Sequence, residues 1–129
     1  MRVSLIVVPV AVVALAGCSS AHLPDVERTA AGFAAAAARG DAAGACDLLA
    51  PATRDVLELR ESLPCTAALA TMPLPGGAVR SAEVWGGAAQ VVLTGDTLFL
   101  TETDDGWRVS AAGCRSRGEA PYACLLEGP

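Results

Sequence analysis

The fold is decided by residues 79–111, which read VRSAEVWGGAAQVVLTGDTLFLTETDDGWRVSA. This stretch contains four short runs rich in β-branched, aromatic and other apolar residues, which favour strands. The runs are residues 79–85, 88–94, 97–102 and 107–111, and the short sequences GG, GD and DDG separate them. Such separators are typical of tight hairpin turns, and consecutive hairpins place each strand beside the one before it. The sequence therefore predicts a four-stranded antiparallel meander, with residues 125–126 as a candidate for an additional short edge strand.

The segment that precedes the meander has the spacing of helices. Val26, Ala30, Phe33 and Ala37 recur at intervals of four, three and four residues, which places them on one face of a helix. Shorter helices are expected between this helix and the proline- and glycine-rich break at residues 73–77. Helices that come first and strands that follow, without alternation, predict an α+β domain with its helices packed on the sheet.

The first eighteen residues have the layout of an export signal. Arg2 is followed by the apolar run 3–15, which is shorter than the roughly 20 residues that a membrane-spanning helix needs. Residues 15–18, LAGC, resemble the lipobox of bacterial lipoproteins. This resemblance implies that residues 1–17 are removed as a signal peptide and that the thiol of Cys18 receives a diacylglycerol. An ordinary cleaved signal or an uncleaved anchor is the alternative.

On this interpretation residues 18–23 form a short lipid-anchored tether, and residues 24–129 form a single α+β domain. The mature chain keeps all 14 acidic residues and loses Arg2, so its net charge falls from −5 to −6. An acidic chain without a basic stripe is an unlikely binder of nucleic acid. The expected partners are membrane lipid, through Cys18, and another protein of the cell envelope. The expected location is the extracytoplasmic face of the cell membrane.

Five cysteines become an even set once Cys18 is assigned to lipid. The remaining four are Cys46, Cys65, Cys114 and Cys124. An even number of cysteines in an exported chain predicts disulfides, for which three pairings exist. Pairing the nearest in sequence, Cys46 with Cys65 and Cys114 with Cys124, fits the segment boundaries best. A four-thiolate metal site is the alternative, but it lacks close pairs of cysteines, and no metal ligand is predicted.

The predicted order of elements resembles the cone-shaped fold shared by nuclear transport factor two and ketosteroid isomerase, a cystatin-like arrangement. The residues that carry this resemblance lie in 33–41, 45–51, 107–109 and 112–114, which include ACDLLAP, WRV and AGC. They also resemble small actinobacterial lipoproteins with such a domain, and the absence of Lys and Asn is typical of a GC-rich genome. The resemblance implies a curved sheet that wraps a helix around a pocket. It implies no activity, because this fold hosts enzymes and binders alike.

Catalytic residues are not predicted, and neither is a cofactor. The only histidine, His22, falls in the expected tether. Isomerases of the cone-shaped fold pair an acidic base with a group that stabilises an oxyanion. The candidates here are Asp96 or Glu102 as the base and Tyr122 as the stabilising hydroxyl. Since Asp96 falls in a hairpin turn and Tyr122 in the stapled C-terminal loop, we interpret them as a turn residue and a surface aromatic. The sequence DDG before Trp107 is likewise interpreted as a turn and not as a calcium loop.

Three aromatic residues, Phe33, Trp85 and Trp107, are predicted to lie in the core or to line a pocket. The function expected from these observations is a non-catalytic accessory or interaction module on the outside of the membrane. One alternative is a binder of a small apolar molecule in the cone, and another is an enzyme of the isomerase or dehydratase kind. A filled core favours the first function, an apolar pocket the second, and a pocket with a buried carboxylate the third.

Overall fold

The computed structural model describes residue 9 and residues 19–129. The predicted signal peptide, residues 1–17, and the predicted lipidation site, Cys18, lie outside this range apart from Pro9. The helices are α1 (Ser19–Ala38), α2 (Ala42–Asp47), α3 (Pro51–Glu61) and α4 (Cys65–Ala70). The strands are β1 (Val79–Trp85), β2 (Ala88–Leu93), β3 (Thr97–Thr103), β4 (Gly106–Arg117) and β5 (Ala120–Glu127). Within the described part of the chain, no helix is long and apolar enough to cross a membrane.

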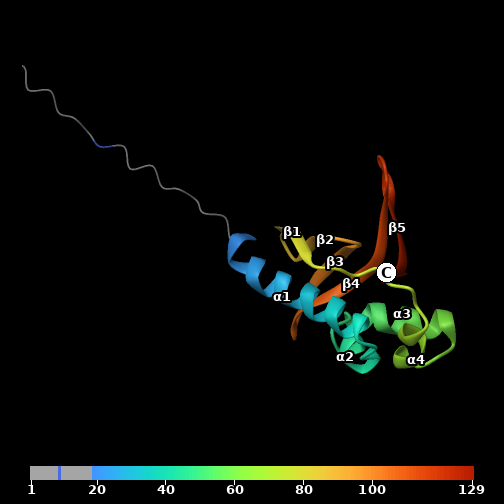
Figure 1. The fold of residues 1–129 in the computed structure, drawn as a ribbon. Helices are drawn as coiled ribbons and strands as arrows, with labels where there is room; N and C mark the ends of the chain where they lie inside the picture. Colours follow the sequence, from blue (N-terminus) through green and yellow to red (C-terminus); the bar gives the residue numbers. More distant parts are fainter. Residues whose placement is uncertain (1–8, 10–18) are drawn as a thin grey trace, which may run out of the picture.

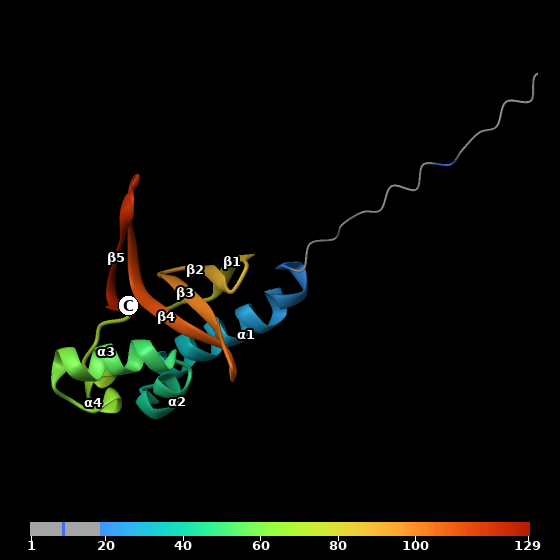
Figure 2. The ribbon, with the colours of Figure 1, turned by 180° about the vertical axis from the view of Figure 1, so that it is seen from behind.

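The domain is α+β, as predicted, with helices packed on an antiparallel sheet. The sheet has five strands in the order β1-β2-β3-β4-β5, so the prediction of four strands is wrong. The fourth run continues to Arg117, and the expected loop is a hairpin in which Cys114 lies directly opposite Cys124. Sequence reasoning missed this hairpin because small, charged and proline residues dominate it. Figures 1 and 2 show β4 and β5 projecting as a long hairpin beyond the other strands.

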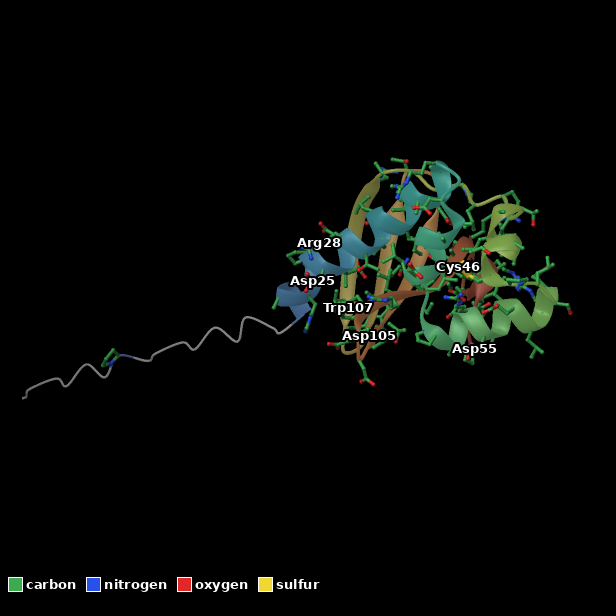
Figure 3. All side chains as sticks on the ribbon, turned by 90° about the horizontal axis from the view of Figure 1, so that it is seen from below. Asp25, Arg28, Cys46, Asp55, Asp105 and Trp107 are labelled. Carbon is green, nitrogen blue, oxygen red and sulfur yellow. A yellow bond between two sulfur atoms is a disulfide. The ribbon has the colours of Figure 1, made fainter. Side chains whose placement is uncertain are left out.

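Helix α1 covers one face of the sheet, and the core lies between them (Figure 3). Burial alternates along β2 and β3, so that every second side chain points towards α1. The largest fully buried apolar side chains are Val26, Phe33, Leu57, Val91, Leu98, Leu100, Val109 and Leu126. Burial of each such side chain stabilises the fold by about 1.5–3 kcal/mol. The helical spacing of Val26, Ala30 and Phe33 therefore marks the face that packs on the sheet.

The N-terminal helix is longer than the sequence predicts. It begins at Ser19 and contains Pro24, so residues 19–23 form the first turns of α1 and not a separate tether. Pro24 is the sixth residue of α1, so it lies inside the helix and removes one backbone hydrogen bond between successive turns. The imidazole of His22 lies 5.7 Å from the ring of Trp107, centroid to centroid, which links this extension to the domain.

Helices α2, α3 and α4 form a second group beside the end of α1. The carboxylate of Asp41 accepts a hydrogen bond from the backbone N–H of Gly44 at 2.9 Å and thereby caps α2. This bond, with help from Arg39, holds the pKa of Asp41 below its ordinary value of 3.8. A disulfide joins Cys46 on α2 to Cys65 on α4, and a second one joins Cys114 to Cys124. Both pairs are those that the sequence favours.

Candidate functional site

The space between α1 and the sheet is filled by side chains. Phe33 is 1% exposed and Trp107 is 4% exposed, so both belong to the core. Trp85 is 50% exposed, which contradicts a core position for this residue. The strand register places Trp85 in the same row as Arg108 of β4, so these two side chains share a face of the sheet. Trp107 directly precedes Arg108 and therefore points to the opposite face. The pocket expected beside both tryptophans is therefore not formed between them.

An open groove lies on the other face of the sheet, away from α1; we call it the outer groove. It consists of two adjoining hollows of about 430 and 240 Å³, which share Phe99, Ser110 and Pro129. The larger hollow is bounded by Trp85, by Thr101 and by the first residues of α3. The smaller hollow is bounded by residues of the β4–β5 hairpin. The outer groove is thus a continuous surface between α3, the five strands of the sheet and the C-terminus.

The start of α3 forms one wall of the outer groove, and hydrogen bonds to carbonyl oxygens of β4 hold it in place. Ala50 donates from its backbone nitrogen to the carbonyl oxygen of Val109 at 2.8 Å. The hydroxyl of Thr53 donates to the carbonyl oxygen of Ser110 at 3.1 Å, and Gly128 donates to the same oxygen at 2.9 Å. Ser110 sits at a register shift between β3 and β4, which exposes its carbonyl to these two donors. The bulge therefore fixes α3 and the C-terminus on either side of the groove.

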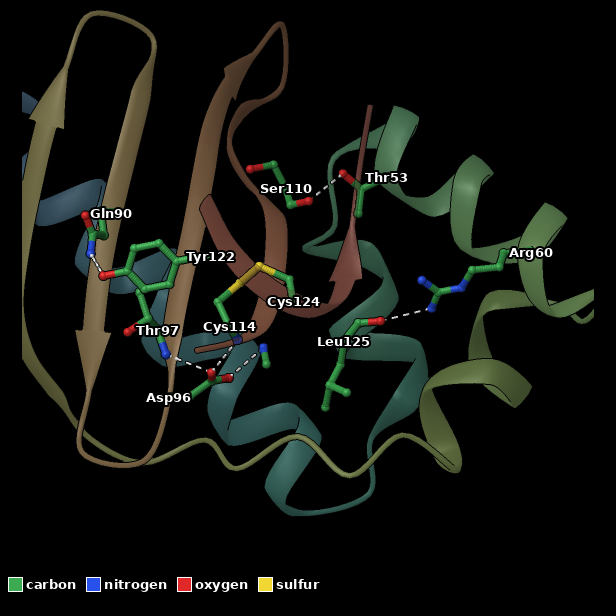
Figure 4. Close-up of a disulfide and its surroundings, with 11 residues drawn as sticks. Thr53, Arg60, Gln90, Asp96, Thr97, Ser110, Cys114, Tyr122, Cys124 and Leu125 are labelled. Atoms are coloured by element: carbon green, nitrogen blue, oxygen red, sulfur yellow. Dashed lines mark hydrogen bonds between the residues drawn. A yellow bond between two sulfur atoms is a disulfide. The ribbon is translucent and has the colours of Figure 1, made fainter. Parts of the chain in front are cut away.

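Two aromatic rings form the opposite wall. The rings of Phe99 and Tyr122 meet edge to face with their centroids 5.2 Å apart. Gln90 donates from Nε2 to the hydroxyl of Tyr122 at 3.2 Å (Figure 4). These contacts fix Tyr122 against the outer face of β2 and β3. Tyr122 is thus half-buried on β5, so its predicted place in a loop is wrong, and as an aromatic on the surface it lines the groove.

Asp96 lies in the turn between β2 and β3, as interpreted from the sequence, but it is buried, with 8% of its surface exposed, which the sequence does not indicate. Its Oδ1 atom accepts hydrogen bonds from the backbone nitrogens of Thr97 at 2.7 Å and Cys114 at 3.0 Å. Its Oδ2 atom accepts a third bond, from the backbone nitrogen of Gly113 at 3.0 Å (Figure 4). Both oxygens are therefore engaged with backbone donors. Asp96 lines neither hollow of the outer groove.

The structure does not assemble the isomerase-like pair considered from the sequence. Glu102 is exposed and shares a sheet face with Trp107, whereas Tyr122 lies over the opposite face. Asp96 is bound to backbone groups and not to Tyr122. Among the described residues that line the outer groove, Tyr122 carries a hydroxyl on its ring and Glu127 carries a carboxyl group.

Other charged and aromatic groups occupy places outside the groove. A hollow of about 260 Å³ lies beside α3. Its charged lining residues are Asp47, Arg54, Asp55, Asp105 and Arg108. In the part of the chain that the structure describes, no group of three or more His, Cys, Asp or Glu side chains is arranged to hold a metal ion. The same part contains one buried side-chain polar atom without a hydrogen-bond partner, Nε1 of Trp107.

Comparisons with known proteins found no matching family, no matching curated protein and no matching solved structure. The resemblance to the cone-shaped fold of nuclear transport factor two and ketosteroid isomerase therefore stays a prediction.

Proposed function

We propose that the protein is an extracytoplasmic lipoprotein, anchored through Cys18, whose domain is a non-catalytic interaction module that receives a partner in the outer groove. The observation that carries the proposal is that the open hollows lie on the outer face of the sheet. Phe33 and Trp107 are buried between α1 and the sheet, while the larger hollows form an open groove with aromatic walls on the outer face. Aromatic side chains that bury large areas at little loss of rotamer freedom dominate the energetics of protein interfaces.

The shape of the groove favours a macromolecular partner over a small molecule. Small-molecule sites enclose most of their ligand's surface, whereas both hollows are open to solvent. A small apolar ligand is the second candidate, because Trp85, Phe99 and Tyr122 offer three aromatic contacts in one groove. We further propose kinship with the cone-shaped fold, which the order of helices followed by an antiparallel sheet supports.

The anchor is tested by replacing Cys18 with alanine. A protein held by two acyl chains stays in the membrane, because each buried methylene contributes about 0.8 kcal/mol to binding. Cys18→Ala is therefore expected to leave an unprocessed precursor or to release the protein into the medium. Partitioning of the full-length variant into detergent and its mass measure this result. Unchanged processing and unchanged detergent partitioning would show that Cys18 is not the anchor.

The outer groove is tested with a photo-reactive amino acid in intact cells. Introduced at Thr101, which lines the groove, it is expected to cross-link one defined envelope protein. Phe99→Ala should reduce the yield of that adduct several-fold, because it removes the aromatic contact surface that both hollows share. The matched control is the same probe at Thr66, an exposed residue of α4 that lies outside the groove.

Equal labelling from Thr101 and Thr66 would contradict a docking role for the groove. A small molecule that copurifies with the protein, and that protects Thr101 from labelling, would favour the second candidate.

A further inference from the structure

The start of α1 leaves no spacer between the proposed anchor and the folded domain. Ser19 is the first residue of the helix, and it directly follows Cys18. Consecutive Cα atoms are about 3.8 Å apart, so a lipid on Cys18 would be attached next to the first turn of α1. A domain attached in this way cannot drift far from the bilayer, in contrast to one on a long flexible linker.

Two hairpin turns lie at the same end of the domain as the first turns of α1. His22 contacts the ring of Trp107, and the hydroxyl of Thr29 lies 3.4 Å from the carbonyl oxygen of Trp107. Figure 3 shows Asp25, Arg28, Trp107 and Asp105 gathered at this end. The β3–β4 turn, which precedes Trp107, is thus adjacent to the start of α1.

The strand register shows that the turn between β1 and β2 lies at this same end of the sheet. Trp85 lies opposite Ala88, Ala88 opposite Thr101, and Thr101 opposite Arg108, so these residues form one row across four strands. The turn after Trp85 is also bound directly to β3, since the backbone nitrogen of Glu102 donates to the carbonyl oxygen of Gly87 at 2.9 Å. We call this surface the hairpin end: His22, Trp85 and the turn residues 86–87 and 104–106.

We propose that the hairpin end lies against the phospholipid surface of the membrane, with the indole of Trp85 at the level of the headgroups. This inference rests on the proposed anchoring through Cys18. Trp85 is one of the few large apolar side chains on the described surface, with 50% of it exposed. An indole has an apolar body and one polar N–H, which suits the boundary between water and acyl chains. The groove would then open, at its Trp85 end, towards the membrane.

The charges of the hairpin end determine whether electrostatic attraction can hold it at the membrane. Asp104 and Asp105 are exposed in the β3–β4 turn, and the nearby Asp25 is paired with Arg28 at 2.7 Å. This surface therefore offers no excess of positive charge to anionic lipid. The covalent attachment next to α1 holds the hairpin end at the membrane, and electrostatic attraction does not. The contact should consequently be closer on zwitterionic phosphatidylcholine than on anionic vesicles at low salt, where repulsion is least screened.

The experiment uses the full lipid-modified protein, reconstituted into phosphatidylcholine vesicles that contain brominated phosphatidylcholine. Bromine quenches tryptophan by contact, and Trp85 is one of two tryptophans in the chain. We expect a loss of up to half of the emission relative to vesicles without bromine. The matched control is Trp85→Phe, which leaves the buried Trp107 as the reporter and should show little quenching.

A second variant separates orientation from anchoring. Insertion of twelve glycine and serine residues between Cys18 and Ser19 adds a spacer with a root-mean-square length of about 20 Å. This variant should still float with the vesicles but should lose most of the quenching.

Each other outcome overturns the proposal. If the wild-type protein floats without quenching, or if the spacer variant is quenched equally, anchoring holds and the orientation is wrong. If the wild-type protein does not float with the vesicles, the anchor itself is wrong and the orientation falls with it.

Discussion

Asp96→Asn is expected to lower the free energy of unfolding by about 1–3 kcal/mol, although the two side chains have nearly the same shape. The carboxylate accepts three backbone hydrogen bonds, two on Oδ1 and one on Oδ2. An asparagine has a single acceptor oxygen, so its amide group would face at least one backbone N–H, a contact between two donors. Asp96→Ala should be more destabilising, because it leaves the buried donors of Gly113 and Cys114 without partners.

The effect should be large because these bonds join parts of the chain that are distant in sequence. Asp96 sits in the β2–β3 turn, and its partners Gly113 and Cys114 lie 17 and 18 residues further along, on β4. Gly113 has a φ of 65°, and a Cβ atom there would lie 2.9 Å from three side-chain atoms of Leu125. Only glycine fits this bend without strain. The bend, its disulfide and the turn are therefore held together by one carboxylate.

The measurement is urea unfolding of the purified full-length protein, followed by far-ultraviolet circular dichroism. The matched control is Asp104→Asn, which makes the same chemical change at an exposed turn residue and should stay within about 0.5 kcal/mol. Equal midpoints for Asp96→Asn and Asp104→Asn would show that the hydrogen bonds of Asp96 contribute nothing net to stability.

The central part of the sheet was predictable because its signal is local. The predicted runs 79–85, 88–94 and 97–102 agree with β1, β2 and β3 to within one residue at each end. Alternating burial and glycine-containing turns are both properties of neighbouring residues, so the sequence displays them directly. The hairpin of β4 and β5 lacks such a pattern. The register of β4 is set by its pairing with β3, and that of β5 by its pairing with β4 and by the Cys114–Cys124 disulfide. These contacts join distant residues, so the pattern of residues 112–127 alone does not display them.

The candidate site was less predictable than the fold. The burial of Asp96 depends on β4 folding back over the β2–β3 turn, so a local reading of the GD dipeptide gives only a turn. The outer groove depends equally on distant contacts, since Tyr122 reaches Phe99 and Gln90 from β5. One signal was present: Gln90 and Phe99 occupy the alternate positions of their strands that do not face the core. A large aromatic residue at such a position indicates a second contact surface.

Trp107→Ala is expected to lower the free energy of unfolding by about 3–5 kcal/mol, the usual range for removal of a buried aromatic side chain. Small domains are stable by only about 5–15 kcal/mol in total, so a large part of the stability would be lost. Trp107 is 4% exposed and lies between β3, α1 and the imidazole of His22. Its removal would leave a cavity at the point where the start of α1 meets the sheet. Thermal unfolding by circular dichroism measures the loss.

Two further variants separate the volume of Trp107 from its polar atom. Trp107→Phe keeps most of the ring volume and removes Nε1, a buried donor without a partner among the described residues. Since a buried unpaired donor is unfavourable by about 1–3 kcal/mol, this removal offsets part of the lost packing, and the variant should be much more stable than Trp107→Ala. Trp85→Ala is the matched control at an exposed site and should change stability by about 1 kcal/mol or less. Equal melting temperatures for Trp107→Ala and Trp85→Ala would contradict a core role for Trp107.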